Sequence, residues 1–443
     1  LNNGGLPSVL LPPPTVAAAR KLTTSFIDDT VMPKIFTYSL GIQHELYRNA
    51  TMEVRYLGTR GLELPVQYRM NHESFFDAGG TPLPTYLTAS SIPATYTAST
   101  PMDTAYYNFS SFKPEFEAAG FTANVTGDPP KGSSRYNGLA VNFIQRSRHG
   151  LTMNANWTWS HAQDNSTNEF FTSFLNPRRA QDTNQLRQDW SNSDLDVRHH
   201  FALAMIYQVP GMHTESALMR ALVNGFGIGS TYLLQTGQPI TLQSGNAGID
   251  SNGNGDSAGD RGVLNPAGTS LTGSDIFAVC ASSAGTTSGV AVGSTYVAPV
   301  SILNSTNING CANNPSAPNL ADPAIGYTPV NPNARYVLAG PGAVTTIGRN
   351  SFYSPGFGIW NVSAFKTIKF TEGTSLQIRG DAYNVLNQRN YTLSNTNVFS
   401  TAGVTTATSN PGYAIITDPN FLNASHFFSG GNRTMTIAVH FNF

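Results

Sequence analysis

The chain has 443 residues, of which 40% are hydrophobic and only 12% are charged, and its formal net charge at pH 7 is −1. Soluble domains carry about 25% charged residues, whereas Asn, Ser, Thr, Gly and aromatic residues take that place here. No run approaches the roughly 18 apolar residues that a membrane-spanning helix needs. The near-zero net charge and the lack of a Lys/Arg cluster argue against a nucleic acid partner.

Taken in chain order, residues 1–33 are predicted to be irregular loop, because Pro12, Pro13 and Pro14 follow one another. Beyond them, apolar and polar residues alternate in nine segments. Period two indicates a strand with one apolar face and one polar face, and the clearest case is LTMNANWTWSHA. The nine predicted strands are 34–46, 51–60, 135–146, 151–162, 196–209, 226–238, 357–370, 375–387 and 432–443.

The connections between these strands alternate between short and long. Strands pair as hairpins across turns such as 47–50, 147–150 and 371–373, and every hairpin is followed by a long connection without periodicity, predicted to lack structure of its own. The long connections are 61–134, 163–195, 239–355 and 388–431. Outer-membrane barrels have short periplasmic turns and long external loops. Their tilted strands need about 9 to 11 residues, and each predicted strand has ten or more.

The sequence therefore predicts an all-β fold, a transmembrane antiparallel β-barrel in the bacterial outer membrane, in contact with its lipid. A secreted β-sandwich or a propeller would also show alternating strands. Their connections would not alternate in length, however, and no blade-length repeat is present. The barrel is the better interpretation.

The terminal strand, NRTMTIAVHFNF, ends the chain on an aromatic residue. Val439, Phe441 and Phe443 lie on its apolar face. If the short turns are periplasmic, this strand runs inward and Phe443 lies in the periplasm. We expect these three residues to form a C-terminal insertion signal for the barrel-assembly machinery.

Eight segments carry a resemblance to a known family. They are VRYLGTRGLELP (54–65), YNGLAVNFIQR (136–146), LTMNANWTWSHAQDN (151–165), LDVRHHFALAMIYQVP (195–210), LLQTGQPIT (233–241), GRNSFYSPGFGIWNVSAFK (348–366), LQIRGDAYNVLNQRNY (376–391) and NRTMTIAVHFNF (432–443). In this order they resemble the C-terminal part of TonB-dependent outer-membrane receptors of the Oar-like type, which carry a carboxypeptidase-regulatory-like N-terminal domain.

The resemblance implies a 22-stranded barrel, filled by an N-terminal plug and energised through the inner-membrane proteins TonB, ExbB and ExbD. Residues 1–443 would then be the C-terminal part of one barrel domain, and the chain is expected to be a fragment without plug or TonB box. Energised uptake of a bulky solute is the implied function.

Six charged residues have the parity of the polar faces and are predicted to face the lumen. They are Glu53, Arg55, Asp196, Arg198, Arg379 and Asp381. They could contact the plug or line a substrate path. The alternative is a solvated wall of mixed charge that needs no ligand, since lumen substitutions mostly tune selectivity.

The only two cysteines, Cys280 and Cys311, lie in the connection 239–355. A disulfide between them is expected in an oxidising compartment. Two thiolates without a nearby His fall short of the four ligands of a zinc site.

One stretch imitates the start of a calcium-binding loop, with candidate ligands Asp250, Asn252, Asn254 and Asp256. Arg261 stands where the closing Glu should be, so a flexible hydrophilic loop is the alternative. No catalytic constellation and no cofactor motif is found, and the chain is not expected to be an enzyme.

Two other functions stay open beside energised uptake: a surface protein for adhesion or protein sorting, and a passive porin. The connections 61–134 and 239–355 are expected to determine ligand specificity. Siderophores, cobalamin, oligosaccharides and peptides all remain candidate solutes.

Overall fold

The structure is a computed structural model of the whole chain. It describes residues 15–25, 31–79, 109–166, 180–182, 185–244, 250–255, 260–266, 268–281, 287–288, 298–302, 324–331, 333–339, 345–371, 373–391, 413–426 and 429–443. Strands dominate these residues and the helices are few and short. No helix in these ranges is long and apolar enough to cross a membrane.

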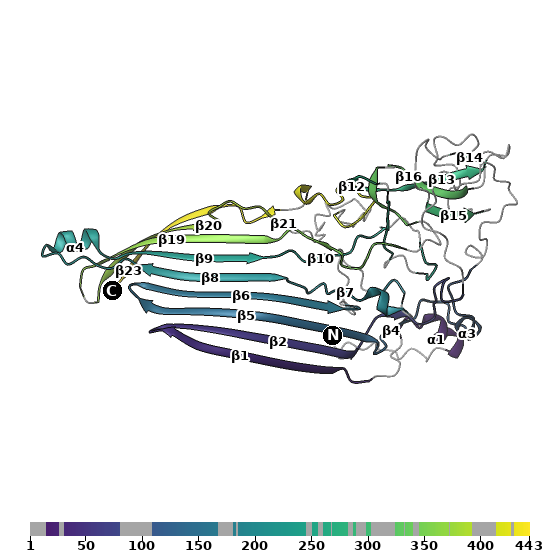
Figure 1. Cartoon of the computed structure of the whole chain (residues 1–443), viewed down its shortest axis with the longest axis horizontal. Helices are drawn as coiled ribbons and strands as arrows, with labels where there is room; N and C mark the ends of the chain where they lie inside the picture. Colours follow the sequence, from purple (N-terminus) through teal and green to yellow (C-terminus); the bar gives the residue numbers. More distant parts are fainter. Residues whose placement is uncertain are drawn as a thin grey trace, which may run out of the picture.

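Nine long strands form one antiparallel sheet, in which neighbours in the chain are also neighbours in space (Figure 1). In order, they are β1 (Lys34–Tyr47), β2 (Ala50–Leu64), β5 (Gly132–Arg148), β6 (Leu151–Asp164), β8 (His199–Gln208), β9 (Phe226–Gln235), β19 (Phe357–Lys369), β20 (Ser375–Tyr383) and β23 (Thr434–Asn442). β7 (Ser191–Asn192) adds a short strand beside β6. All nine predicted strands are confirmed, although β20 and β23 have 9 residues each rather than ten or more.

The pairing register keeps the two faces of the sheet separate from one strand to the next. One row of directly paired residues consists of Thr51, Ile144, Asn154, Ala204, Thr231 and Asn361. The adjacent row consists of Met52, Phe143, Ala155, Leu203, Tyr232 and Trp360. We call the face that carries the first row the polar face and the other the apolar face, because side chains alternate between faces along every strand.

The apolar face is exposed. Leu40 is 70% exposed, Trp159 50% and Ile437 84%. Among the hydrophobic side chains described as buried, only Ala50 belongs to the nine strands. In water such a sheet would expose a large continuous apolar surface, so this face suits contact with lipid.

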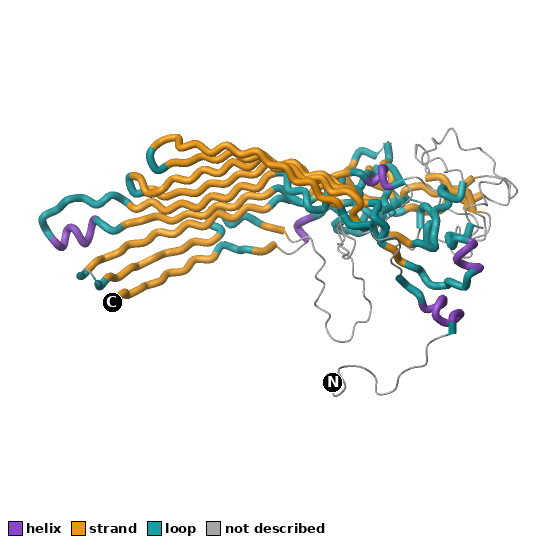
Figure 2. Tube along the Cα trace, turned by 90° about the horizontal axis from the view of Figure 1, so that it is seen from below, coloured by secondary structure: helices purple, strands orange, loops and turns teal. Residues whose placement is uncertain are grey.

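The two rims of the sheet differ (Figure 2). Three connections at the turn rim are tight: β1 to β2, β5 to β6, and β19 to β20. The fourth, from β8 to β9, is longer and contains the helix α4 (Ala217–Val223). The long connections gather at the opposite, loop rim, so the predicted alternation of the two rims is confirmed.

The long connections are not devoid of structure, and that expectation was wrong. They form small sheets: β3 (Tyr68–Arg69) with β4 (Thr126–Gly127); β10 (Pro239–Ile240) with β18 (Phe352–Tyr353); β11 (Val263–Leu264), β17 (Ala334–Val337) and β12 (Ser270–Ser274); β14 (Thr287–Ser288), β13 (Ile276–Ala281), β16 (Ala324–Pro329) and β15 (Ala298–Ile302); and β21 (Asn390–Tyr391) with β22 (Ser429–Gly430). Short helices add to them: α3 (Pro114–Ala118) and the 3₁₀ turns Leu186–Asp189 and Ala424–His426.

A hydrophobic cluster holds part of these connections together at the loop rim. Its buried members are Ile240, Leu242, Tyr336, Ile347, Tyr413, Ala414, Ile416 and Phe421. They come from segments far apart in the sequence, which no local pattern links. In the part of the chain that the structure describes, the hydrophobic core therefore lies in these connections and not in the sheet. We call the described residues of 239–355 and 413–426 the loop cap.

The N-terminal segment also departs from the prediction of irregular loop over 1–33. Helix α1 (Val16–Leu22) has the sequence VAAARKL, which is rich in good helix formers. Thr15 caps it, since its Oγ1 accepts a hydrogen bond from the Ala18 backbone N–H at 3.2 Å. Residues 1–14 lie outside the described part of the chain.

Candidate functional site

Three ion pairs join charged residues two positions apart on or beside the strands of the sheet. They are Glu53 with Arg55, Asp196 with Arg198 (3.1 Å), and Arg379 with Asp381 (2.7 Å). These are the six residues predicted to face the lumen, and register places the β2 and β20 pairs on the polar face. Each pair neutralises itself locally, so these residues add no net charge to that face. That the polar face lines a lumen stays a prediction.

The pair Asp196–Arg198 fastens the chain to the end of β6. The Asp196 side chain is fully buried, and its Oδ1 accepts a hydrogen bond from the Ala162 backbone N–H at 2.7 Å. Arg198 also donates to the hydroxyl of Tyr353 at 3.4 Å. These contacts give the pair a structural role at the loop rim.

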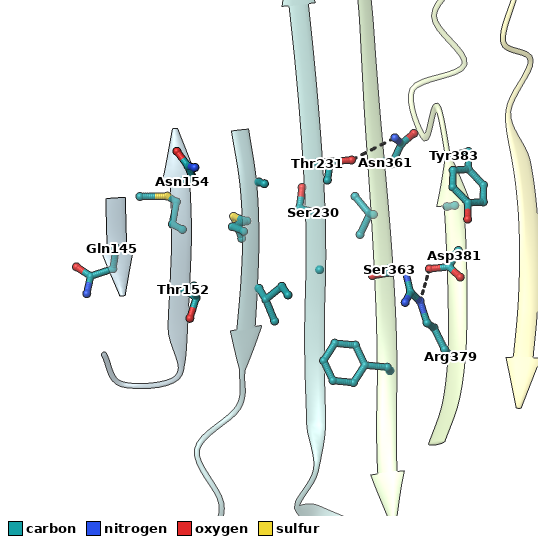
Figure 3. A pocket seen from close by; sticks show the side chains of 18 of the residues that line it. Gln145, Thr152, Asn154, Ser230, Thr231, Asn361, Ser363, Arg379, Asp381 and Tyr383 are labelled. Atoms are coloured by element: carbon teal, nitrogen blue, oxygen red, sulfur yellow. Dashed lines mark hydrogen bonds and ion pairs between the residues drawn. The ribbon is translucent and has the colours of Figure 1, made fainter. Parts of the chain in front are cut away.

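A groove of about 570 Å³ opens on the polar face (Figure 3). Its polar lining comes from five strands and consists of Gln145, Arg146, Thr152, Asn154, Ser230, Thr231, Asn361, Ser363, Arg379, Asp381 and Tyr383. Apolar side chains such as Ile144, Ile206 and Phe365 line it as well. Within it, the Asn361 side-chain amide donates to the Thr231 hydroxyl at 3.2 Å. Figure 3 shows this contact beside the Arg379–Asp381 pair.

Two glycines of β9 make room for side chains of β19 along the groove. Gly229 lines the groove, and a Cβ added there would stand 2.6 Å from the Ser363 hydroxyl. One row further along β9, a Cβ on Gly227 would be 2.2 Å from the Phe365 ring, so that ring covers the glycine. Covering a strand glycine with a cross-strand aromatic ring stabilises the pairing.

The lining of the groove combines polar and apolar groups. It offers hydroxyl and amide groups, the guanidinium groups of Arg146 and Arg379, the second side chain 44% exposed, and the Asp381 carboxylate, beside apolar side chains such as Ile206 and Phe365. Throughout the described ranges, no three His, Cys, Asp or Glu side chains gather closely enough to hold a metal ion. The groove can therefore contact a ligand or a protein segment through hydrogen bonds and apolar packing together.

Sequence reasoning missed a second site, where charged residues from separate connections meet at the loop rim. Arg349 pairs with Asp164 at 2.6 Å, and Arg261 pairs with Asp189 at 2.6 Å. All four side chains are at most 8% exposed. Arg349 also donates to the carbonyl oxygens of Asp164 and Asp189 at 3.0 and 3.1 Å.

These two buried pairs attach the loop cap to the sheet, because Asp164 is the last residue of β6. Arg261 extends the network to Gln181, whose side-chain oxygen accepts from the Arg261 Nε at 2.9 Å. A guanidinium donating to several fixed acceptors orients each of them. The cap is thus held in one position relative to the polar face.

Asn350 completes the attachment. Its side-chain amide donates to the Asn192 carbonyl at 2.6 Å and to the Asp194 carboxylate at 2.7 Å. Its oxygen accepts from the Thr241 hydroxyl at 2.9 Å. Its φ of 51° lies in the left-handed region, which Asn tolerates better than most residues. The one signal in the sequence was the segment GRNSFY, where an Arg and an Asn follow a Gly in a chain with little charge.

Two predicted loop features are only partly within the described residues. Cys280 lies in β13, but Cys311 falls outside the described part of the chain, so the disulfide stays a prediction. Asp256 also falls outside it. Asp250 accepts hydrogen bonds from the backbone N–H groups of Asn254 and Gly255, at 3.1 and 2.6 Å.

The rest of the calcium candidate is a turn that bonds to itself and to a neighbour. Asn252 Oδ1 accepts from the Asn254 N–H at 3.1 Å, and its amide donates to the Gln181 carbonyl at 2.5 Å. Calcium binding stays a prediction.

The terminal strand takes its predicted place in the sheet, and that its end lies in the periplasm stays a prediction. β23 pairs with β20, with Val439 opposite Ile378 and Phe441 opposite Leu376, and it ends at the turn rim. On the apolar face Val439 is 63% exposed and Phe441 58%, and Phe443 beyond the strand is 97% exposed. The role of these residues in membrane insertion stays a prediction.

One protein family matches most of the chain. A profile of the family described as "Outer membrane beta barrel domain" matches residues 3–416. Among solved structures, the outer membrane transporter YddB from Escherichia coli shares 9% identity at a TM-score of 0.36, covering 96% of this chain and 35% of that one. No curated protein matches the chain.

Two receptors are similar in the same way. BauA, the ferric preacinetobactin receptor from Acinetobacter baumannii, shares 8% identity at a TM-score of 0.35, over 92% of this chain and 29% of that one. The pyoverdine outer membrane receptor FpvA from Pseudomonas aeruginosa shares 9% identity at a TM-score of 0.33, over 93% of this chain and 30% of that one. The chain spans about a third of the length of these solved proteins.

Proposed function

The chain belongs to the outer membrane beta-barrel domain family, and on this premise we propose that it forms part of the barrel wall of a TonB-dependent receptor. The receptor takes up a bulky solute across the bacterial outer membrane. Its plug domain, of the carboxypeptidase-regulatory-like type in Oar-like receptors, contacts the polar face. TonB, ExbB and ExbD supply the energy through that domain.

The proposal rests on the two faces of the sheet, whose exposure is the reverse of that in a soluble protein. Its apolar face is exposed and its polar face holds a groove of about 570 Å³. A lipid-facing sheet with a polar inner face encloses an aqueous path when it closes.

The edges of the sheet support the view that further strands complete the barrel. In the described residues β1 and β23 each pair on one side only, and every residue of β1 is exposed. Open strand edges in a membrane are costly, because lipid offers no hydrogen bonds. Both edge strands run towards the turn rim, so antiparallel closure needs an odd number of added strands. A 22-stranded barrel meets this condition.

The loop cap supports capture of the solute from outside. The buried pairs of Arg349 and Arg261 hold segments of the long connections in one position, as a preorganised binding surface requires. The solute itself stays open among siderophores, cobalamin, oligosaccharides and peptides. Adhesion and passive diffusion are the competing functions.

The test is uptake by the full-length protein in cells with and without TonB. Cells are offered ferric siderophores, cobalamin, an oligosaccharide mixture and a peptide mixture, each carrying a radioactive label. We expect accumulation of one class, lost when TonB is deleted. Accumulation that survives the deletion would mean a passive pore, and adhesion without accumulation would mean a surface-binding protein.

A matched pair of variants tests the part played by the groove. Thr231→Trp places a bulky ring in the groove on β9, whereas Ile228→Trp places the same ring on the apolar face of the same strand. We expect the first to reduce uptake and the second to leave it unchanged at equal membrane levels. Equal uptake by both variants would remove the groove from the solute path.

A further inference from the structure

Helix α4 distinguishes one connection at the turn rim from the other three. Its apolar side chains point away from the rest of the protein: Leu218 is 70% exposed, Met219 48% and Leu222 59%. Met212, in the strand-to-helix connection, is 59% exposed. An isolated helix of 7 residues has little stability of its own, so its position must come from attachments.

The attachments are present at both ends. Ser216 caps the helix, its Oγ accepting from the Met219 N–H at 3.4 Å. The side chain of Asn224 closes the connection by accepting from the Met212 N–H at 2.7 Å and donating to the Met212 carbonyl at 2.9 Å. Gly225 follows with a φ of 82°, as a helix C-terminus prefers. The exposed apolar side chains therefore belong to a defined surface.

Lys366 shows on which side of the sheet this surface lies. It pairs with Phe226 and Ile378 on the apolar face. Its Nζ donates to the carbonyl oxygens of Leu222 and Asn224 at 2.7 and 2.6 Å, and it lies 3.9 Å from the centre of the Phe226 ring. Lys366 thus lies on the lipid-facing side, and the carbonyl oxygens at the C-terminal end of α4 stabilise its positive charge.

We propose that α4 is an interfacial anchor that inserts Leu218, Met219 and Leu222 into the phospholipid of the periplasmic leaflet. The surface continues the lipid-facing side of β9, where Phe226 is 45% and Ile228 44% exposed. An aromatic ring at a strand end marks the level of the lipid headgroups. The helix begins beyond that ring, at the depth where amphipathic helices lie in a membrane.

The charges of the segment fit an anionic lipid surface. Arg220 lies two positions from both Leu218 and Leu222, which places it on the opposite side of the helix. Lys366 adds a second positive charge beside the helix end. Basic residues that flank an apolar helix face attract anionic headgroups. The anchor would set the depth and tilt of this side of the barrel.

Spin-label accessibility in the intact protein tests the proposal. Leu218→Cys, Leu222→Cys and Glu215→Cys are each made in a Cys280→Ser/Cys311→Ser background, labelled with a nitroxide, and reconstituted in vesicles of phosphatidylethanolamine and phosphatidylglycerol. Glu215 lies on the exposed approach to the helix and is the matched aqueous control. Val439→Cys, on the apolar face of β23, is the lipid reference.

We expect oxygen, which concentrates in lipid, to relax the labels at positions 218 and 222 more than a water-soluble nickel complex does, as at position 439. At position 215 the nickel complex should relax the label more than oxygen does. Dominance of the nickel complex at 218 and 222 would place α4 in water and overturn the proposal. Protection of both labels from both reagents would show that protein covers the helix, which would equally overturn it.

Discussion

Replacing Arg349 with Met should release the loop cap from the sheet. The Arg349 side chain is 5% exposed and its partner Asp164 7% exposed. Four hydrogen bonds of its guanidinium go to the Asp164 carboxylate at 2.6 Å, to the carbonyls of Asp164 and Asp189 at 3.0 and 3.1 Å, and to the Ser191 hydroxyl at 3.2 Å. Arg349→Met removes all four and leaves the Asp164 charge buried.

Removing one partner of a buried pair costs about 3 to 5 kcal/mol. Since about 1.4 kcal/mol corresponds to a tenfold change, opening of the cap should become about 10²- to 4 × 10³-fold more frequent. The sheet should keep its stability, because none of the four acceptors lies in the middle of a strand. The loss is therefore local.

Hydrogen exchange read by mass spectrometry measures this opening directly. We expect the backbone N–H groups of 239–244 and 334–339 to exchange faster in Arg349→Met, with those of β5 and β6 unchanged. Arg55→Met is the matched control, since it breaks an exposed pair, with Arg55 58% exposed, worth at most about 1 kcal/mol. Unchanged exchange in Arg349→Met, or an equal effect of Arg55→Met, would refute the reasoning.

Three further predictions concern pH and the chain end. Burial raises the pKa of the Asp128 carboxyl, so the carboxyl ionises at lower pH when this segment is open, and the stability of the closed segment falls as pH rises above about 4. Asp128→Asn should therefore slow hydrogen exchange of residues 126–132 at pH 7 and leave it unchanged below pH 4. The effect should correspond to well under about 1 kcal/mol, because solvent screens the group. Burial also raises the pKa of the Tyr336 and Tyr413 hydroxyls, so the loop cap should lose stability and open above about pH 10. Ultraviolet absorbance of the phenolate measures this ionisation. The opening should be smaller in Tyr336→Phe. Deleting Phe443 should lower the amount of protein in isolated outer membranes, and an unchanged amount would remove it from the insertion signal.

Much of the sheet could be predicted from local pattern. The alternation over 151–162 corresponds to β6, which extends only to Asp164. The prediction failed where a strand stops for a tertiary reason: β20 ends at Tyr383, because Asn384 adopts a φ of 49° and its N–H donates to the Asn361 side chain at 2.9 Å. The pattern of 384–387 contains no sign of that contact.

The candidate site, too, could be predicted from the sequence only in part. Parity alone assigned Glu53, Arg55, Arg379 and Asp381 to the polar face, and register agrees. The opposite charges of each pair stand two positions apart on one strand, so their mutual neutralisation is a local property of the sequence. The sequence contained no sign that a groove would lie beside one of these pairs. The groove depends on which residues of neighbouring strands meet.

By itself the sequence determined nine strands, their two faces and their two rims, because a period of two and the length of a connection are local properties of the chain. Only the tertiary structure decided how the long connections pack. Arg349 and Asp164 are 185 positions apart, and the attachment of α4 depends on Lys366, 144 positions from Leu222. Contacts at such separations leave no periodic trace in the sequence, since they form only after the sheet has brought the distant segments together.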